Sequence, residues 1–308
     1  MNLRHLPSWL PALCCAVLCF LMAAPQALGQ GKTIQLRRLA ERVPVDDLGN
    51  IVNESSAIGF NANPDVDAFK ALSRDLGLVF APRFLTPAET LGEAGFDVGF
   101  GASISTLDGA ADHWRVLDSS PGVFTTGQIY VRKGLPFSFE FGGSLSHLFD
   151  SDMVAVGTEL KWALNEGFLY LPDIAVRGSV NNIVGSSDLN LTNAGADVSI
   201  SKAFAMAGVM SITPYFGYNR LWIISSSRLL DVAPDDPTPP EIEACDVNDV
   251  NCVEELRFQP EFVFGTEVQL VNRYFVGSRF IFGVATITLE SAFSEGVQNY
   301  SGSVGFDF

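Results

Sequence analysis

The sequence is poor in charged residues, and basic residues are the scarcest of them. Charged side chains make up 18% of the 308 residues, below the roughly 25% of an average soluble domain. The 19 lysines and arginines are outnumbered by 35 aspartates and glutamates, so the net charge is −16 at neutral pH. This balance argues against a nucleic-acid partner, because phosphates are bound by clustered lysine and arginine.

Long hydrophobic runs are also missing, apart from one at the N-terminus. Beyond that run, no stretch reaches the roughly 18 consecutive apolar residues that mark a membrane-spanning helix. The N-terminal run follows Arg4 and ends at Pro25 and the small residues before Gln30. A basic start, an apolar stretch and small residues in this order predict a secretory signal peptide over residues 1–29.

Cysteine and histidine are rare after the predicted cleavage site. Only Cys245, Cys252, His113 and His147 remain there. Two cysteines with six residues between them, in an exported chain, predict one local disulfide. So few ligands argue against a zinc site, and we expect neither a metal nor another cofactor.

Alternation of apolar and polar residues is what the chain has in abundance. From residue 94 to residue 105, Phe96, Val98, Phe100 and Ile104 share one face, while aspartate, glycine and serine occupy the other. Successive side chains of a strand point to opposite faces, so a period of two predicts β-strands. Ten such strands are predicted, at residues 94–105, 121–132, 136–147, 153–164, 173–182, 192–202, 209–221, 258–270, 278–290 and 298–308.

The last predicted strand carries a more specific pattern. Tyr300, Val304, Phe306 and Phe308 alternate with small and polar residues, and the chain ends on Phe308. This ending resembles the C-terminal signature of bacterial outer-membrane β-barrel proteins, a broad class rather than one family. The resemblance implies that the barrel-assembly machinery recognises the C-terminal strand.

The strand lengths distinguish a membrane barrel from a soluble β-sandwich. Strands of a sandwich are usually about five or six residues long, whereas a tilted strand needs about 9 to 11 residues to cross hydrocarbon. We therefore predict an all-β, antiparallel transmembrane barrel of ten strands in the outer membrane of a Gram-negative cell, with membrane lipids around it. Eight strands remain possible if the weak segments 121–132 and 278–290 do not pair, and twelve if residues 76–85 do.

The N-terminal segment, residues 30–91, differs from the predicted barrel at residues 92–308. Residues 63–65 have the composition of a helix start, and Gly77 is expected to end that helix. The spacing of residues 86–89 fits a capping box and predicts a second short helix. The segment lies either in the periplasm or in the lumen as a plug.

Charged residues on the inward face of the predicted strands are candidate lumen residues. Seven acids face two bases there, which predicts a narrow, acidic lumen. Either Lys161 and Arg177 pair with carboxylates in a structural network, or the acids line a path that prefers cations. The lumen-facing set is Asp97, Glu140, Glu159, Lys161, Arg177, Asp197, Glu261, Glu267 and Glu290.

A long loop at residues 222–257 is predicted on the outer side, where barrels of this kind have their longer loops. Residues 231–255 contain nine acids and no base, and a disulfide between Cys245 and Cys252 would constrain the far half of the loop. The run is either a solvated, self-repelling loop or a cell-surface site for divalent cations. The acids in question include Asp235, Asp236, Glu241, Glu243, Asp246 and Asp249.

A hydrolase is suggested by Ser144, Ser146 and His147, which are close in sequence. Alternation places His147 on the lipid side and the serines on the inner side, so we predict no catalytic residue and no enzymatic activity. The leading functional prediction is porin-like passage or binding of small molecules through the lumen. The alternative is a structural or surface-interaction protein that acts through its acidic outer loop, and a surface hydrolase is the third interpretation.

Overall fold

The computed structural model describes residues 34–45, 50–53, 59–117, 122–206, 210–231 and 261–308. The predicted signal peptide, Cys245 and Cys252 lie outside these residues, and so do residues 232–257 of the predicted outer loop. Residues 222–227 of that predicted loop are not loop, because they continue a barrel strand. No helix among the described residues is long and apolar enough to cross a membrane.

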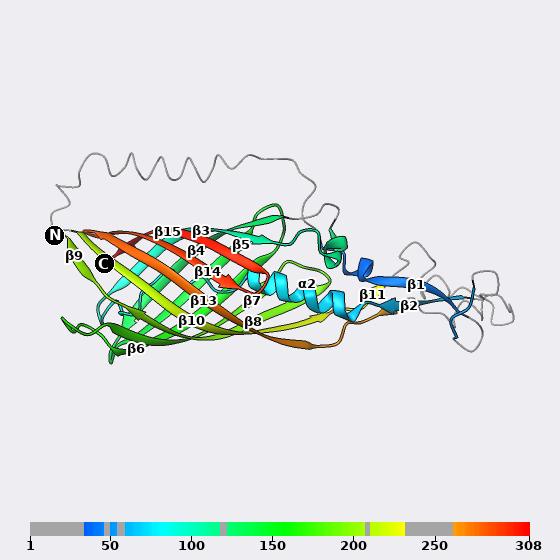
Figure 1. Cartoon of the computed structure of the whole chain (residues 1–308), viewed down its shortest axis with the longest axis horizontal. Coiled ribbons are helices and arrows are strands. Elements are labelled where there is room, and N and C mark those ends of the chain that lie inside the picture. Colours follow the sequence, from blue (N-terminus) through cyan, green and yellow to red (C-terminus); the bar gives the residue numbers. More distant parts are fainter. Residues whose placement is uncertain (1–33, 46–49, 54–58, 118–121, 207–209, 232–260) are drawn as a thin grey trace. The chain divides into compact units, whose positions relative to one another are not determined.

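Ten long strands form a closed antiparallel barrel (Figure 1), which confirms the predicted fold and strand number. Consecutive strands pair, β10 pairs with β13, and the last strand returns to the first, from Val297 beside Leu107 to Asp307 beside Asp97. The barrel strands are β3 (Phe96–Leu107), β4 (Val123–Leu135), β5 (Phe139–Leu148), β6 (Val154–Asn165), β7 (Asp173–Val184), β8 (Leu189–Ser201), β10 (Met210–Ser227), β13 (Glu267–Phe282), β14 (Ala285–Ser294) and β15 (Val297–Asp307).

Two strand positions differ from the prediction. The segments 258–270 and 278–290 were expected to be strands, but β13 and β14 are separated by a turn at Gly283. The φ of Gly283 is 66°, in the left-handed region that glycine adopts without strain. Phe280, Ile281 and Phe282 make the end of β13 apolar on both faces, so alternation gives no signal for this turn.

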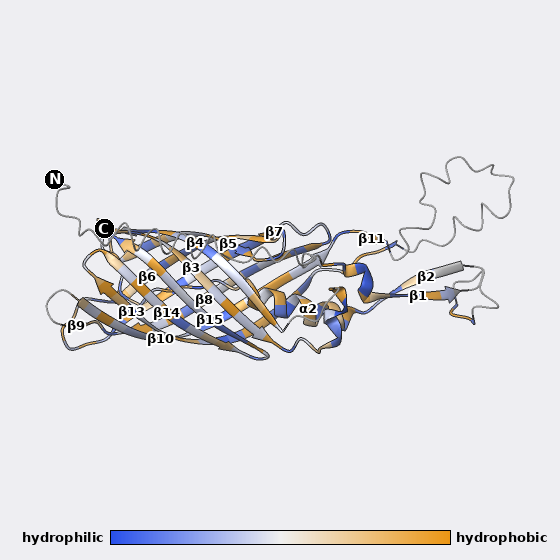
Figure 2. Ribbon diagram, turned by 90° about the horizontal axis from the view of Figure 1, so that it is seen from above, coloured by the Kyte–Doolittle hydropathy of each residue, from blue (hydrophilic) through white to orange (hydrophobic). Residues whose placement is uncertain are grey.

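The outer wall of the barrel is apolar and exposed. Phe100, Leu145, Leu160 and Phe216 are each about half exposed, and polar or small residues alternate with them on the inner face. Figure 2 shows this alternation of hydrophobic and hydrophilic residues along the strands. Such a surface is unfavourable in water but is the expected surface of a barrel that hydrocarbon surrounds.

The two ends of the barrel differ in their connections. Phe96 and Phe308 exchange two backbone hydrogen bonds at one end, where the turns at residues 136–138 and 283–284 are tight. The longest connections, residues 108–122 and 228–266, are at the opposite end. Short turns of bacterial barrels face the periplasm, so the end with Phe308 is the periplasmic end and the other is the outer end.

Only residues 66–91 of the predicted N-terminal segment lie in the lumen, as a plug, whereas the described residues before them lie at the outer end, which was not predicted. Helix α2 (Val66–Val79) starts at the N-cap Asp65, and Gly77 lies inside the helix rather than at its end. The second helix expected at residues 86–89 is not formed, because the Thr86 hydroxyl accepts a hydrogen bond from Lys161 and does not cap a helix. The shorter elements are η1 (Leu36–Leu39), β1 (Ala40–Val45), β2 (Gly59–Pro64), η3 (Asp112–Val116), β9 (Phe204–Met206), β11 (Leu230–Asp231) and β12 (Glu261–Phe262).

Apolar packing holds α2 in the outer half of the barrel. Phe69 and Leu76 are fully buried in one cluster with Leu221 and Ile223 of β10, and the ring of Phe69 stacks on Phe264 at 4.3 Å. Beyond Val79 the chain continues without regular structure through the periplasmic half of the lumen to β3. Residues 66–91 are called the plug below.

Candidate functional site in the barrel lumen

The plug is held in the lumen by hydrogen bonds from inward-facing side chains. Backbone carbonyls accept from the wall at several heights, for example Gly77 from Asn193 at 2.9 Å and Glu89 from Lys161 at 2.8 Å. Backbone N–H groups of the plug donate in turn to carboxylates, Leu85 to Glu290 at 3.0 Å and Leu91 to Glu140 at 3.1 Å. A segment without secondary structure can be buried only if its backbone groups are paired in this way.

Seven charged side chains form an alternating row around the periplasmic half of the lumen, called the ionic belt here. Each pair lies between 2.7 and 3.6 Å apart, so every charge has a partner of opposite sign. A buried pair can offset its desolvation only when its geometry is good and its remaining donors are satisfied. In the order in which the ion pairs link them, the belt residues are Asp307, Arg279, Asp97, Arg132, Glu159, Arg177 and Asp197.

Phe84 is a plug residue that contacts two arginines of the ionic belt. Its ring is fully buried, lies 3.7 Å below the guanidinium carbon of Arg177, and contacts Phe275 at 5.5 Å between centroids. Its backbone carbonyl accepts a hydrogen bond from Arg132. Phe84 is thus bound through its ring and its backbone by two arginines of the belt, which fixes the register of the plug in the lumen.

Arg83 anchors the C-terminal end of α2. Its guanidinium donates to the carbonyls of Leu78, Val79 and Ala81, and also to Asn299 of β15 at 2.7 Å. The last carbonyls of a helix lack partners within the helix, and a cation there also favours the helix dipole. Arg83 therefore provides hydrogen-bond donors for the last carbonyls of the helix and also connects the helix to the barrel wall.

The predicted lumen residues fall into three groups in the structure. Asp97, Glu159, Arg177 and Asp197 belong to the ionic belt, whereas Lys161 pairs with Glu140 at 3.0 Å. Glu290 accepts from the Tyr215 hydroxyl at 2.9 Å, and Glu267 pairs with Lys70 of α2 at 3.5 Å near the outer rim. Glu261 does not face the lumen as expected, because it lies in β12, outside the ten barrel strands.

The prediction of a strong excess of acid over base in the lumen is wrong. Four more arginines are buried there, and each is at most 8% exposed. Arg132 lies in a strand that the sequence marked as weak, and Arg273 and Arg279 lie in the strand whose bounds were misplaced. Arg83 comes from the plug, which barrel alternation cannot place. Applying the period of two to residues 124–132 would have found Arg132, since Phe124, Thr126, Gln128 and Tyr130 share its inward face.

At the outer end, the η3 segment closes over the start and middle of α2. His113 and Asp75 are both buried, with Nε2 and Oδ2 2.9 Å apart, and Arg115 pairs with Asp65 at 2.8 Å. The Asp65 carboxylate also accepts from the Ala68 N–H at 2.9 Å. That backbone hydrogen bond, followed by the one from Arg115, lowers the pKa of Asp65 below its ordinary value.

The residues that suggested a hydrolase are not brought together. His147 is exposed and contacts Phe149, whereas Ser144 and Ser146 are half-buried on the opposite face of β5. Within the described residues, no group of three or more histidine, cysteine, aspartate and glutamate side chains is suited to hold a metal ion. The acidic-loop residues Asp235 to Asp249 and the predicted disulfide lie outside the described residues.

Comparisons with known proteins found similar solved structures but no related family or sequence. No protein-family model matches the chain, and no curated protein matches its sequence. The β-domain of the Bordetella autotransporter BrkA is similar in structure, with a TM-score of 0.38 at 8% identity, over 70% of this chain and 100% of that one. A COG4313 outer-membrane channel from Pseudomonas putida F1 gives 0.32 at 9% identity, over 72% and 98%. Ail of Yersinia pestis gives 0.25 at 11% identity, over 70% and 99%.

All these TM-scores are below 0.5, so the assignment of the barrel rests on the strand pairing and the apolar outer wall described above. A closed barrel of long antiparallel strands with an apolar outer wall is the architecture by which β-proteins cross a bilayer. The chain is therefore an outer-membrane β-barrel protein with its own N-terminal segment inside the lumen.

Proposed function

We propose that this protein is a surface-interaction barrel whose lumen is closed by its own N-terminal segment. One observation carries the proposal, namely the plug, which is bound to the inward faces of the strands from the outer rim to the periplasmic end. Gln269 contacts it near the outer rim and Glu140 near the periplasmic end. A barrel of this size has little room for side chains of its own and a peptide together with an open path.

The outer end offers the surface for such an interaction. The plug runs from the outer end to β3, so η1, β1 and β2, which precede it, lie at the outer end with η3 and β11. The backbone N–H of Gln35 donates to the carbonyl of Val116 in the η3 segment there. Arg37 and Ile51 are exposed, and the exposed fraction of Ile51 is 69%. The acidic loop starts from the same end, next to Asp231, so the proposed surface combines this loop with Arg37, Arg38 and Arg42, which lie in η1 and β1.

Passage of small molecules through the lumen is the weaker interpretation on this geometry. It rested on an acidic lumen in which two bases left several carboxylates unpaired. Arg132 and Arg279 supply partners for Asp97 and Glu159, and Lys161 and Arg132 also bond the plug. We likewise propose that the protein is not an enzyme, since the serines and histidine of β5 face opposite sides of the strand.

Single-channel recording in planar bilayers tests the closed lumen. We expect the purified full chain to be silent, because an ion would have to displace the plug. Conductance steps that prefer cations in the wild type, and that lose this preference in Glu159→Gln or Glu140→Gln, would refute the closed lumen and support passage. Phe141→Ala on the outer wall is the matched control, because it alters no lumen residue.

Binding by whole cells tests the surface interaction. Cells that display the protein should bind a fluorescent decalysine peptide, and the signal should fall when Asp235, Asp236, Glu241 and Glu243 are replaced by their amides. The control replaces Asp108 and Asp112, acids of the η3 connection at the same end. Equal binding by all three cell types would contradict a role for the acidic loop.

A further inference from the structure

A pocket opens at the outer rim because two neighbouring strands differ in height. The pairing of β13 with β14 stops at Arg273 and Ser294, whereas its pairing with β10 continues to Glu267 and Ser225. Among the described strands, residues 267–272 of β13 are therefore paired on one side only. Beside this free edge lies a pocket of about 560 Å³.

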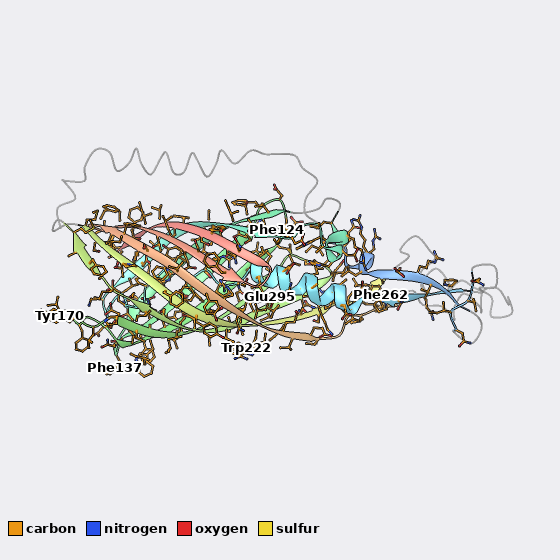
Figure 3. All side chains as sticks on the ribbon, in the orientation of Figure 1. Phe124, Phe137, Tyr170, Trp222, Phe262 and Glu295 are labelled. Atoms are coloured by element: carbon orange, nitrogen blue, oxygen red, sulfur yellow. The ribbon has the colours of Figure 1, made fainter. Side chains whose placement is uncertain are left out.

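The lining of the pocket combines three kinds of chemistry. Arg74 of α2 contributes a guanidinium, and Glu295, in the turn after β14, contributes a carboxylate. Gln269 and Asn272 add polar groups from β13, and Tyr274 and Phe293 add aromatic rings. Figure 3 shows Glu295 beside α2 at the outer end of its hairpin. The free edge of β13 also presents unpaired backbone N–H and C=O groups, as any edge strand does.

The position of the pocket indicates which solvent it faces. Tyr274 and Phe293 point outward from the wall and are 52% and 40% exposed. Tyr218 lies beside Tyr274 and Tyr300 beside Phe293, with ring centroids 5.3 and 6.5 Å apart, which gives an aromatic band near the outer end. Such bands lie at the level of the lipid head groups, so the pocket opens just above the acyl chains of the outer leaflet.

We propose that this rim pocket binds the phosphorylated sugar head group of an outer-leaflet glycolipid. Arg74 is 35% exposed, and its Nε and Nη2 each lie 3.4 Å from one oxygen of Asp75, so its Nη1 remains available to a phosphate. The Glu295 carboxylate accepts hydrogen bonds from sugar hydroxyls and disfavours a second phosphate at its side. The acyl chains then descend along Tyr274 and Phe293, so the ligand is an amphiphile rather than a free sugar.

Native mass spectrometry of the full chain in detergent tests this assignment. The probes are a monophosphorylated disaccharide glycolipid, the same lipid without phosphate, its deacylated sugar phosphate, and phosphatidylglycerol. The variants are Arg74→Gln and Glu295→Gln. Lys70→Gln is the matched control, because Lys70 is an exposed cation one turn away on α2 that does not line the pocket. Far-UV circular dichroism shows whether each variant keeps its strands.

We expect the phosphorylated glycolipid to bind best. Arg74→Gln should weaken it by about tenfold or more, as the loss of a hydrogen bond between two charged groups predicts, and should leave the unphosphorylated lipid unchanged. Glu295→Gln should weaken both glycolipids, and Lys70→Gln neither. Equal binding of phosphatidylglycerol, or equal effects of Arg74→Gln and Lys70→Gln in folded protein, would overturn the proposal. Tighter binding of the deacylated sugar phosphate would overturn the lipid as its source.

Discussion

Replacing Phe84 by alanine should loosen the plug while the barrel stays closed. The ring is fully buried and lies against Arg177 and Phe275, whereas the bond from Arg132 goes to the backbone carbonyl and survives the substitution. The barrel strands keep all their backbone pairing, because Phe84 belongs to none of them. The variant thus separates the docking of the plug from the stability of the wall.

The size of the effect follows from what the ring contacts. Truncating a fully buried phenylalanine to alanine costs about 3–5 kcal/mol, and a desolvated cation–π contact such as that with Arg177 is worth about 2 kcal/mol of this total. At about 1.4 kcal/mol per tenfold change, the population with an undocked plug should rise by about two to four orders of magnitude.

Hydrogen exchange of the α2 backbone amides measures that population. In Phe84→Ala, amides in Phe69–Leu76 that exchange through undocking should become faster by up to the same factor, while amides of β5 and β6 keep their rates. Phe141→Ala is the control, because its ring is about half exposed on the outer wall. If α2 exchanges at the wild-type rate in Phe84→Ala, the idea that Phe84 anchors the plug is wrong.

Three further predictions concern the belt and the helix. Arg132→Gln leaves Glu159 and Asp97 short of a partner in the lumen and should lower the free energy of unfolding by about 3–5 kcal/mol in denaturant titrations, while Arg37→Gln at the outer end should change it little. Asp65→Ala removes the N-cap of α2 and should cost about 1 kcal/mol by hydrogen exchange. Because the folded-state pKa of Asp65 is lowered, its stabilisation is present at neutral pH and is lost as the pH falls through that pKa, a pH dependence that Asp65→Asn should abolish. Gly77→Ala places a methyl group 2.6 Å from the Ile223 side chain and should destabilise α2 by about 1–3 kcal/mol, whereas unchanged melting would mean that Ile223 moves aside freely.

The barrel could be predicted from sequence because its wall faces two solvents. Hydrocarbon on one side and polar groups on the other impose a period of two, which residues 94–105 display clearly. The period fails where both faces are apolar, and for that reason the turn at Gly283 was missed. It also predicted a barrel strand at residues 258–270, where Phe262 and Phe264 are buried instead, Phe264 against Phe69 of α2.

The charge of the lumen could not be predicted from the strands alone. Three of the four additional arginines lie in barrel strands, but Arg83 comes from the plug, which has no strand period, and its position depends on where α2 ends. Helix signals placed α2 within two residues but made Gly77 its end, since a glycine commonly follows a helix. In the structure the missing side chain makes room for Ile223, a close approach that local sequence does not reveal.

The two halves of the plug stabilise the closed state by different means. In the periplasmic half, the hydrogen bonds that Lys161 and Arg132 donate to the plug, and the one that Glu140 accepts from it, replace bonds that water would make in an empty lumen, so each adds little net free energy. In the outer half, Phe69 and Leu76 are fully buried, and each such side chain contributes about 1.5–3 kcal/mol. Apolar packing of α2 therefore supplies most of the driving force for docking, while the polar contacts determine the register. A plug cut back to its polar half should consequently bind weakly, even though every hydrogen-bonding partner on the wall is still present.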